Sequence, residues 1–224
     1  DYITDFSKKL IQKWKGPWPL ISSACPAIIR LIQVRFPELI ENILPVESPM
    51  ECAAQIAKQE FCRRHGVDEA QVGIFFITPC AAKMTSIRSP IGKEKSAVDG
   101  AISILEIYGP LAASMNKLES KPNIQKATLW GVGWANSGGE SYAIGTDNYL
   151  AVNGIHNVIH VLEQIENGKL SDLEFFEGLA CTGGCVGGPL VFENSFVAQT
   201  RIKKLVERMT EADKINKDLD PAYK

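Results

Sequence analysis

The sequence EGLACTGGCVGGP, residues 177–189, contains two cysteines separated by three residues and set among glycines. This spacing lets Cys181 and Cys185 place two thiolates on one side of a turn, close enough to bind the same inorganic cluster. Because glycine has no Cβ, the backbone can approach such a cluster and point its N–H groups at sulfur. Short motifs also match by chance, so a glycine-rich turn with two incidental cysteines is the alternative. The stretch by itself leaves both interpretations open.

The composition is that of an ordinary globular chain. It has 224 residues, of which 45% are hydrophobic and 22% charged, enough for one large domain or two small lobes. A net charge of −2 excludes a general affinity for nucleic acid or acidic membranes, so we expect neither as a partner. The sequence has no apolar run long enough to cross a bilayer and no signal-peptide pattern. Six cysteines without a secretory signal favour a reducing, cytoplasmic location and ligation or redox chemistry over disulfides.

Three cysteines follow segments that we predict to be strands. The strands PLIS, VGIFFITPC and LEFFEGLAC end beside or on Cys25, Cys80 and Cys181. The second of these is a nearly continuous apolar run, as expected for a strand covered on both faces. Parallel strands bring their carboxyl ends to one edge, so we expect these sulfurs to converge there with Cys185. Four thiolates match a 4Fe-4S cluster, whereas structural zinc sites usually come as short paired knuckles, which only the last pair resembles.

The remaining pattern alternates strands with helices and predicts a parallel α/β fold. Helices are predicted at 5–14, from Pro26 to 36, at 49–65 after a capping box that begins at Ser48, at 106–118, 153–168 and 196–209. Further strands are predicted at 97–104 and 126–134.

Other chemically suggestive residues favour a structural interpretation. Cys52 and Cys62 lie on different faces of one predicted helix, so core packing is the better explanation for both. His156 and His160 are four residues apart on a helix and could bind a metal, but the sequence shows no third ligand. The stretch GVGWANSGG lacks the third glycine of a dinucleotide-binding motif, since that position is Asn136.

The three cysteine motifs resemble a known family. SSACP, TPCAAK and EGLACTGGCVGGP occur in the order of the signature motifs of the catalytic domain of iron-only (FeFe) hydrogenases, roughly TSCCP, MPCxxK and ExMACxGGCxxGG. The match extends to a PELI segment after the first motif and covers most of the chain. The resemblance implies two lobes of parallel sheet flanked by helices, with an iron–sulfur and diiron site in the cleft between them.

The resemblance also implies a domain organisation. A hydrogenase-like domain spans 1–210, with one lobe formed by about 1–95 plus C-terminal elements and the other by 96–180. The charged tail 211–224 follows. The upstream segment that lines part of the family's diiron pocket is expected to be absent from this chain.

In that family, four cysteines hold a 4Fe-4S cluster, and the last also bridges to a diiron unit that carries CO, cyanide and a bridging dithiolate. The implied cluster ligands are the motif cysteines Cys25, Cys80, Cys181 and Cys185. Cys185 is the implied bridging residue, and Lys83 matches the lysine that hydrogen-bonds a cyanide through its ammonium group. Pro79 and Gly184 belong to the same motifs and are assigned to the cofactor-binding set.

Several positions depart from the family pattern. The proton-donating cysteine before the first ligand is replaced by Ala24, whose methyl group cannot relay a proton. The acidic residues that continue that route fall on Phe6 and Lys9. Other family residues are replaced by Met50, Thr78, Ser86 and Leu179. This pattern is similar to a divergent, sensory branch in which such domains are fused to signalling modules.

Two hypotheses of function follow. The first is a slow hydrogenase that interconverts H2 with protons and electrons and serves H2 or redox sensing, with electron-transfer or signalling domains as partners. The loss of a positioned acid–base group typically slows a reaction by about 10²–10⁴-fold. The second is a non-catalytic protein that keeps only a 4Fe-4S cluster, for structure or redox sensing, as hydrogenase-like assembly factors do. Lys83 favours the first, whereas Ala24 and the missing upstream segment favour the second.

Overall fold

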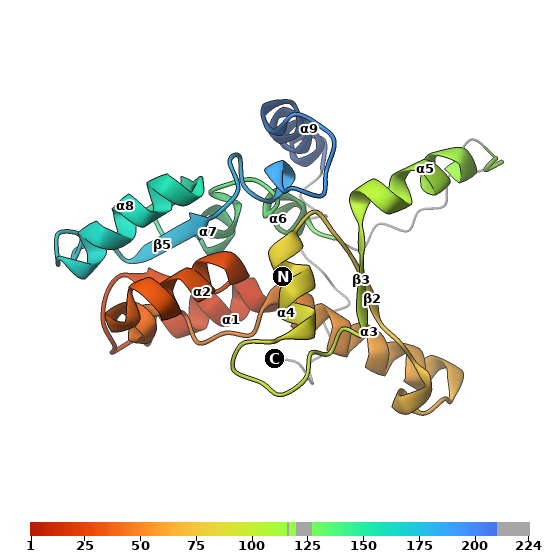
Figure 1. The fold of residues 1–224 in the computed structure, drawn as a ribbon, viewed down its shortest axis with the longest axis horizontal. Helices are drawn as coiled ribbons and strands as arrows, with labels where there is room; N and C mark the ends of the chain where they lie inside the picture. The colour runs from red at the N-terminus through yellow and green to blue at the C-terminus, as the bar shows by residue number, and fades with distance from the viewer. Residues whose placement is uncertain (116, 120–126, 210–224) are drawn as a thin grey trace. The chain divides into compact units, whose positions relative to one another are not determined.

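A computed structural model describes residues 1–115, 117–119 and 127–209 (Figure 1). The chain divides into two units. The first contains the described residues of Asp1–Val46, Gln125–Gly187 and Glu193–Lys224, and the second those of Glu47–Ile124 and Gly188–Phe192. Residues 95 and 96, where we expected two lobes to divide, both belong to the second unit. The expected tail, 211–224, lies outside the described residues.

The first unit is built on a three-stranded parallel sheet of order β1-β5-β4. These strands are β1 (Leu20–Ile21), β4 (Tyr149–Asn153) and β5 (Phe175–Leu179). The helices of this unit are α1 (Tyr2–Ile11), α2 (Pro26–Arg35), η1 (Pro37–Asn42), α6 (Leu129–Gly133), α7 (Gly139–Ile144), α8 (Ile155–Glu166), η3 (Cys185–Gly187) and α9 (Ser195–Glu207). Parallel strands flanked by helices confirm the predicted α/β class.

The pleat of the central strand β5 sends successive side chains into two separate cores. Phe176 packs with residues of α2 and α8, such as Ile32 and Val158, on one face of the sheet. Phe175 packs with Ile144 of α7 and with partly buried residues of α1 on the other face. All five residues of β5 are buried, as expected for a strand covered on both sides.

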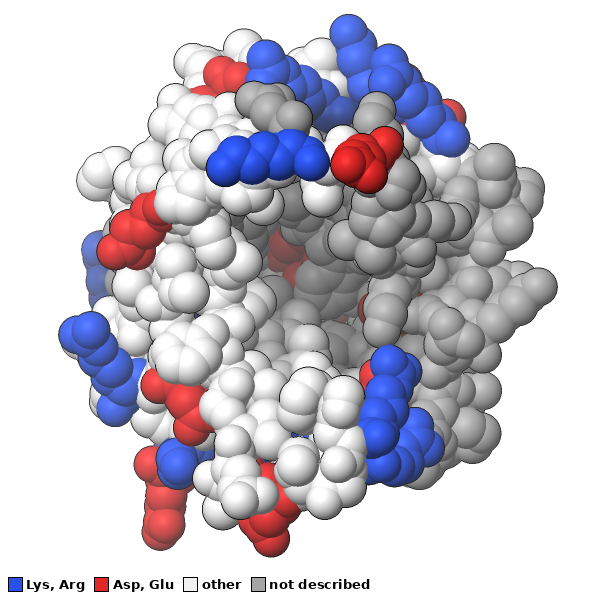
Figure 2. All heavy atoms as spheres, turned by 90° about the vertical axis from the view of Figure 1, so that its right-hand side faces the viewer, with Lys and Arg blue, Asp and Glu red and all other residues white. Residues whose placement is uncertain are grey.

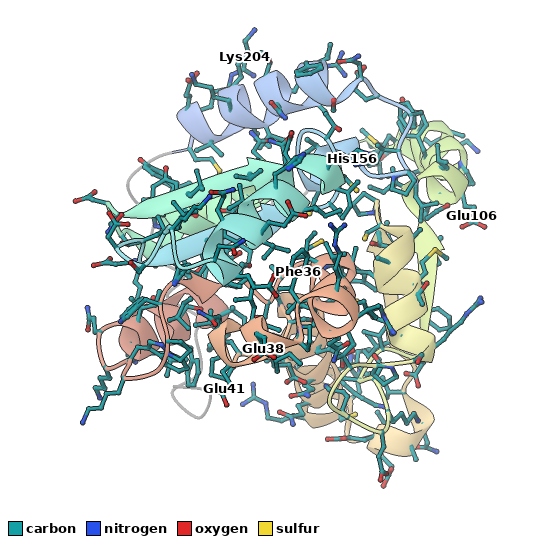
Figure 3. All side chains as sticks on the ribbon, turned by 60° about the vertical axis from the view of Figure 1, so that its left-hand side comes forward. Phe36, Glu38, Glu41, Glu106, His156 and Lys204 are labelled. Carbon is teal, nitrogen blue, oxygen red and sulfur yellow. The ribbon has the colours of Figure 1, made fainter. Side chains whose placement is uncertain are left out.

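The core between α2, α8 and the sheet extends to the end of α2. Phe36, the residue after that helix, is 2% exposed and belongs to the same hydrophobic cluster (Figure 3). Glu38 and Glu41 follow in η1 (Figure 3). This apolar layer gives β1 and β5 a fixed backing, which matters because both strands lead to cysteines.

The second unit has a two-stranded parallel sheet. Its elements are α3 (Pro49–His65), η2 (Glu69–Gln71), β2 (Phe75–Thr78), α4 (Ala81–Arg88), β3 (Gly100–Ser103) and α5 (Ile104–Met115). The expectation that β2 is covered on both faces is wrong for the described residues. Phe75 and Ile77 are 65% and 49% exposed, whereas Phe76 faces the small core that contains Met50 and Val98. An apolar run therefore did not distinguish a half-covered strand from a fully covered one.

The helix α3 begins and ends where its sequence predicts. The Ser48 side chain accepts a hydrogen bond from the Glu51 N–H, and Gly66 ends the helix in the left-handed conformation. The Glu51 carboxylate does not complete a capping box with Ser48. It accepts hydrogen bonds from the Ala97 N–H at 2.7 Å and from the Lys93 ammonium group at 3.1 Å. Burial opposes ionisation of Glu51, but hydrogen bonds from the Ser96 hydroxyl, then from Ala97 and Lys93, keep its pKa below the ordinary value.

Three local predictions were wrong. The first helix covers Tyr2–Ile11 rather than 5–14. The described part of the predicted strand at 126–134 contains the short helix α6 instead, because the Thr128 side chain accepts from the Gly131 N–H and caps a helical turn. The strand β4 was not predicted, although it pairs along its whole length with β5.

No helix in the described parts of the chain is both long and apolar enough to span a membrane. Charged side chains of both signs are interspersed on the face shown in Figure 2.

We predict that two phenylalanines in parallel strands differ sharply in their contribution to stability. Phe176→Ala should lower the free energy of unfolding by about 3–5 kcal/mol, because the side chain is completely buried. The matched variant Phe75→Ala should change it by less than about 0.5 kcal/mol, because that ring is largely exposed. Urea unfolding followed by circular dichroism measures both. An equally large effect at Phe75 would contradict an open face on β2.

Candidate cysteine site

Cys25 and Cys80 occupy equivalent positions in the two units. Each is the residue before a helix that follows a parallel strand, α2 and α4 respectively, and each has extended backbone angles. In each turn a buried hydroxyl accepts the N–H two residues further on. Ser22 Oγ accepts from Ala24 at 3.2 Å, and Thr78 Oγ1 accepts from Cys80 at 3.1 Å. Such local bonds fix the path of the strand-to-helix turn and thereby the position of the thiol.

Three of the four motif cysteines belong to the first unit. Cys25 comes four residues after β1, and Cys181 comes two residues after β5. Because β1 and β5 are adjacent and parallel, both turns leave the same edge of one sheet. Cys185 begins η3 in the same loop as Cys181. All four motif cysteines are partly buried.

The loop that carries Cys181 and Cys185 requires glycine. Gly183 and Gly184 both have φ of +86°, in the left-handed region that other residues rarely adopt. A Cβ on Gly184 would lie 2.8 Å from the backbone nitrogen of Ser137, and a Cβ on Gly187 would lie 1.9 Å from the carbonyl oxygen of Thr182. The backbone of this loop therefore packs more closely than any side chain would allow.

Two polar side chains from different elements form hydrogen bonds with the same loop. The Gly183 N–H donates to Asn153 Oδ1 at 2.9 Å, from the carboxyl end of β4. The Gln199 side-chain amide of α9 donates to the Gly183 carbonyl oxygen at 2.8 Å. The Gly183 backbone belongs to no helix or strand, so its N–H and its carbonyl oxygen are satisfied by these two side-chain amides instead.

The segment between α6 and α7 pairs with the loop through its backbone. The Val186 N–H donates to the Ala135 carbonyl at 3.3 Å, and Asn136 forms an isolated bridge with Gly184. Two buried polar atoms of this segment, Trp134 Nε1 and Asn136 Oδ1, have no hydrogen-bond partner among the described residues. Buried polar groups without partners are uncommon in native structures.

A buried glutamate connects the same region to β5. Glu177 is 1% exposed and accepts from the Gly138 N–H at 2.8 Å, the Ser141 N–H at 2.9 Å and the Ser141 hydroxyl at 2.8 Å. These donors lie at the N-terminus of α7, where a carboxylate is favoured. Burial raises the pKa of Glu177, and the hydrogen bonds offset this rise only in part.

Lys83 lies in the first turn of α4, three residues after Cys80, and is partly buried. Cys80 is the extended residue directly before α4, so the two residues are separated by the first two residues of that helix. The residue before Cys80 is also fixed, because the Pro79 carbonyl accepts from the Leu190 N–H at 3.1 Å. The Leu190 carbonyl in turn accepts from Leu105 at 3.2 Å.

The remaining candidates lie apart from these features. His156 (Figure 3) is exposed on α8. His160 is exposed on the same helix, and its Nδ1 lies 3.6 Å from Glu163. Cys52 and Cys62 are partly buried on α3, and burial, followed by the charge of Glu47, raises the pKa of Cys52. A cavity of about 530 Å³ in the first unit lies at the amino ends of β4 and β5, opposite to the edge from which the cysteine turns leave.

Comparison with known proteins identifies the family. The family model described as iron only hydrogenase large subunit, C-terminal domain, matches residues 2–149 and 145–189. The chain belongs to this family.

Individual hydrogenases agree with this assignment. Iron hydrogenase 1 of Clostridium pasteurianum is 21% identical over 231 aligned residues, and the periplasmic Fe hydrogenase large subunit of Nitratidesulfovibrio vulgaris is 24% identical over 229. Each alignment covers 83% of this chain but only 40% and 54% of those relatives. The FeFe hydrogenase HydA1 from Chlamydomonas reinhardtii has a similar fold, with a TM-score of 0.61 and 15% identity, over 95% of this chain and 71% of that one.

A more limited similarity connects the chain to a different kind of relative. The cytosolic Fe-S cluster assembly factor NAR1 homolog of Schizosaccharomyces japonicus is 30% identical over 67 residues, which cover 30% of this chain and 13% of that protein.

The hydrogenase-family residues present here suit an iron–sulfur cluster by their chemistry. Within the described residues, no three His, Cys, Asp or Glu side chains are grouped so as to hold a single metal ion. A 4Fe-4S cluster instead distributes four thiolates over four irons, and four thiols are available in the motifs. The glycine loop adds closely packed backbone around Cys181 and Cys185, and the neighbouring segment adds Trp134 Nε1, a buried donor without a partner among the described residues; both features suit an anionic cluster.

Several residues around the loop could not be assigned from the motifs. Asn153, Asn136 and Gln199 contact the loop or its neighbouring segment, yet they lie 14 to 45 positions from the nearest motif cysteine. The sequence signal for them is weak: each is an amide side chain beside an apolar element, which is also common on surfaces. Their role depends on which elements become neighbours in space.

We predict that Gly184→Ala destabilises the protein more than Gly168→Ala. Both glycines have positive φ, which costs an alanine about 1–2 kcal/mol. Only Gly184 would also bring a Cβ against backbone, whereas nothing lies within 4 Å at Gly168. Urea denaturation should show about 1–3 kcal/mol of additional loss for Gly184→Ala. Equal losses would contradict the close packing of the cysteine loop.

Glu177 should give the protein a measurable pH dependence. Because its folded-state pKa is raised, it contributes stability that is present below its unfolded pKa of about 4.3 and is lost as the pH rises through the folded pKa. The difference in unfolding free energy between wild type and Glu177→Gln should therefore shrink as the pH rises from about 4. Denaturant titrations at a series of pH values measure it, and a difference that is constant or grows with pH would contradict the prediction.

Proposed function

We propose that this hydrogenase-family domain binds a 4Fe-4S cluster and a diiron subcluster and interconverts H2 with protons and electrons slowly, in the service of H2 or redox sensing. The ligands of the 4Fe-4S cluster are Cys25, Cys80, Cys181 and Cys185. Cys185 also bridges to the diiron unit, which carries CO, cyanide and a bridging dithiolate. When bound, these groups supply the redox and hydrogen chemistry that no amino-acid side chain provides.

The observation that carries this proposal is that the backbone around the motif cysteines is fixed by hydrogen bonds and by close packing. Cys25 and Cys80 each precede a helix after a parallel strand, in a turn held by a buried hydroxyl. Cys181 and Cys185 lie in a loop whose glycines leave no room for side chains. Incidental cysteines have no need of such rigid supports, whereas ligands of a cluster must be held in fixed positions.

The protein's own residues have distinct roles in this proposal. Lys83 offers an ammonium group to an anionic cyanide ligand, as a charge-assisted hydrogen bond. Pro79 and Gly184 shape the backbone next to Cys80 and Cys185. Ala24 leaves the position of the family's proton-relaying cysteine without a titratable group, which accounts for the slow turnover, by about 10²–10⁴-fold.

The alternative is a non-catalytic 4Fe-4S protein with a structural or redox-sensing role. The similarity to the NAR1 homolog, named as an Fe-S cluster assembly factor, favours it specifically. Ala24 is compatible with it as well, since a protein without turnover needs no proton relay. In either case we propose electron-transfer or signalling domains as partners and a cytoplasmic location.

Anaerobic reconstitution of the protein that contains this chain tests both candidates. We predict uptake of about four iron atoms with iron and sulfide alone. A synthetic diiron precursor should then add infrared bands from CO and cyanide, and slow H2 uptake should appear. Iron uptake without infrared bands would leave the non-catalytic alternative, and no iron uptake would exclude both.

Cysteine variants assign the ligands. Cys185→Ala should abolish incorporation of the diiron unit, whereas Cys62→Ala, a partly buried cysteine outside the motifs, should leave it unchanged. Infrared spectra after addition of the precursor measure incorporation. Diiron bands in Cys185→Ala as intense as in wild type would overturn the bridging assignment.

A further inference from the structure

A buried hydrogen bond lies next to the turn that carries Cys25. The Ser22 hydroxyl donates to the Glu140 carboxylate, and the two residues are 1% and 4% exposed. Ser22 follows β1 directly, whereas Glu140 lies in the first turn of α7, 118 positions along the chain. None of the cysteine motifs contains Glu140, and the proposed function gives it no role.

The Ser22 hydroxyl takes part in two hydrogen bonds at once. It donates to Glu140 and accepts the Ala24 N–H at 3.2 Å. The Ser22 N–H also donates to the Phe176 carbonyl of β5 at 2.9 Å. Glu140 therefore orients the hydroxyl that fixes the backbone directly before Cys25.

The same helix end is bound to the strand that leads to Cys181. Glu177 of β5 accepts from Gly138 and Ser141, on either side of Gly139 and Glu140. The pleat explains this arrangement: Ser22 follows Leu20 by two positions and Glu177 follows Phe175 by two, so all four face α7. The N-terminus of α7 thus links the two turns that carry Cys25 and Cys181.

We infer that Glu140 is a positioning residue for the iron–sulfur site, acting through Ser22 on the turn that carries Cys25. The inference rests on the proposed cluster and adds to it a residue that touches none of the ligands. Outer partners of metal ligands typically change metal affinity by about 10- to 100-fold when removed. Glu140 is such a partner, because without its carboxylate the Ser22 hydroxyl loses the acceptor that orients it.

The test measures how firmly the reconstituted cluster is held. The reduced 4Fe-4S cluster of the anaerobically purified protein is followed by electron paramagnetic resonance, and its loss to an iron chelator is timed. Glu140→Ala and Ser22→Ala should each lose the cluster about 10-fold faster than wild type. Because Glu140 acts only through the Ser22 hydroxyl, the double variant should be no faster than Ser22→Ala alone.

Two further variants separate positioning from general stability. Glu140→Gln keeps a side-chain oxygen that can accept from Ser22 and should retain most of the wild-type rate. Thr146→Ala removes another hydroxyl-to-carboxylate bond, from Thr146 to Glu174 at 2.6 Å, at the opposite edge of the sheet, and should not change the rate. The resonance spectrum should shift in Glu140→Ala and Ser22→Ala but not in Thr146→Ala.

The outcomes are distinct. Wild-type loss rates in both Glu140→Ala and Ser22→Ala, or fully additive effects in the double variant, would overturn the inference. If Glu140→Ala does not fold, Ser22→Ala and Glu140→Gln still decide it. A wild-type protein that takes up no iron would show instead that the proposed function itself is wrong.

Discussion

The structure of the first unit depends on the parallel pairing of β5 with β1 on one side and β4 on the other. A central strand buried on both faces alternates its side chains between two cores. Phe176 faces α2 and α8, whereas Phe175 and Glu177 face α7. The same pairing makes two cysteine turns leave one edge of the sheet. A one-residue slip in register would move Glu177 from the N-terminus of α7 into an apolar core.

Features that depend on local sequence could be predicted. The start of α3 at a serine cap, its end at Gly66 and the strand-to-helix change before Pro26 all follow from short-range chemistry. The predictions failed where tertiary contacts decide. The strand β4 forms because β5 offers it a partner, and the exposure of Phe75 depends on which elements cover β2. The chain segment 126–134 looked extended, but one threonine cap was enough to begin a helix there.

The candidate site shows the same division. Its cysteines are recognisable from three motifs, because each motif consists of a few residues that are adjacent in the sequence. The groups that hold the loop are not: Asn153 and Gln199 act on Gly183 from different elements. Glu140 and Ser22 meet across 118 positions. Motifs therefore identify the candidate ligands, whereas the fold supplies the residues that fix the position of their loop and turns.

The division of the chain into units has a consequence for biosynthesis. The central strand of the first unit begins at Phe175, so a growing polypeptide cannot complete that sheet until this strand has been translated. The second unit takes nearly all its residues from one continuous stretch that ends near residue 124, and adds only 188–192 later. Local contacts form faster than distant ones, so the second unit has the earlier opportunity to fold. Residues 1–46 are synthesised before their sheet partners β4 and β5, so they can complete the first unit only after those strands have been translated.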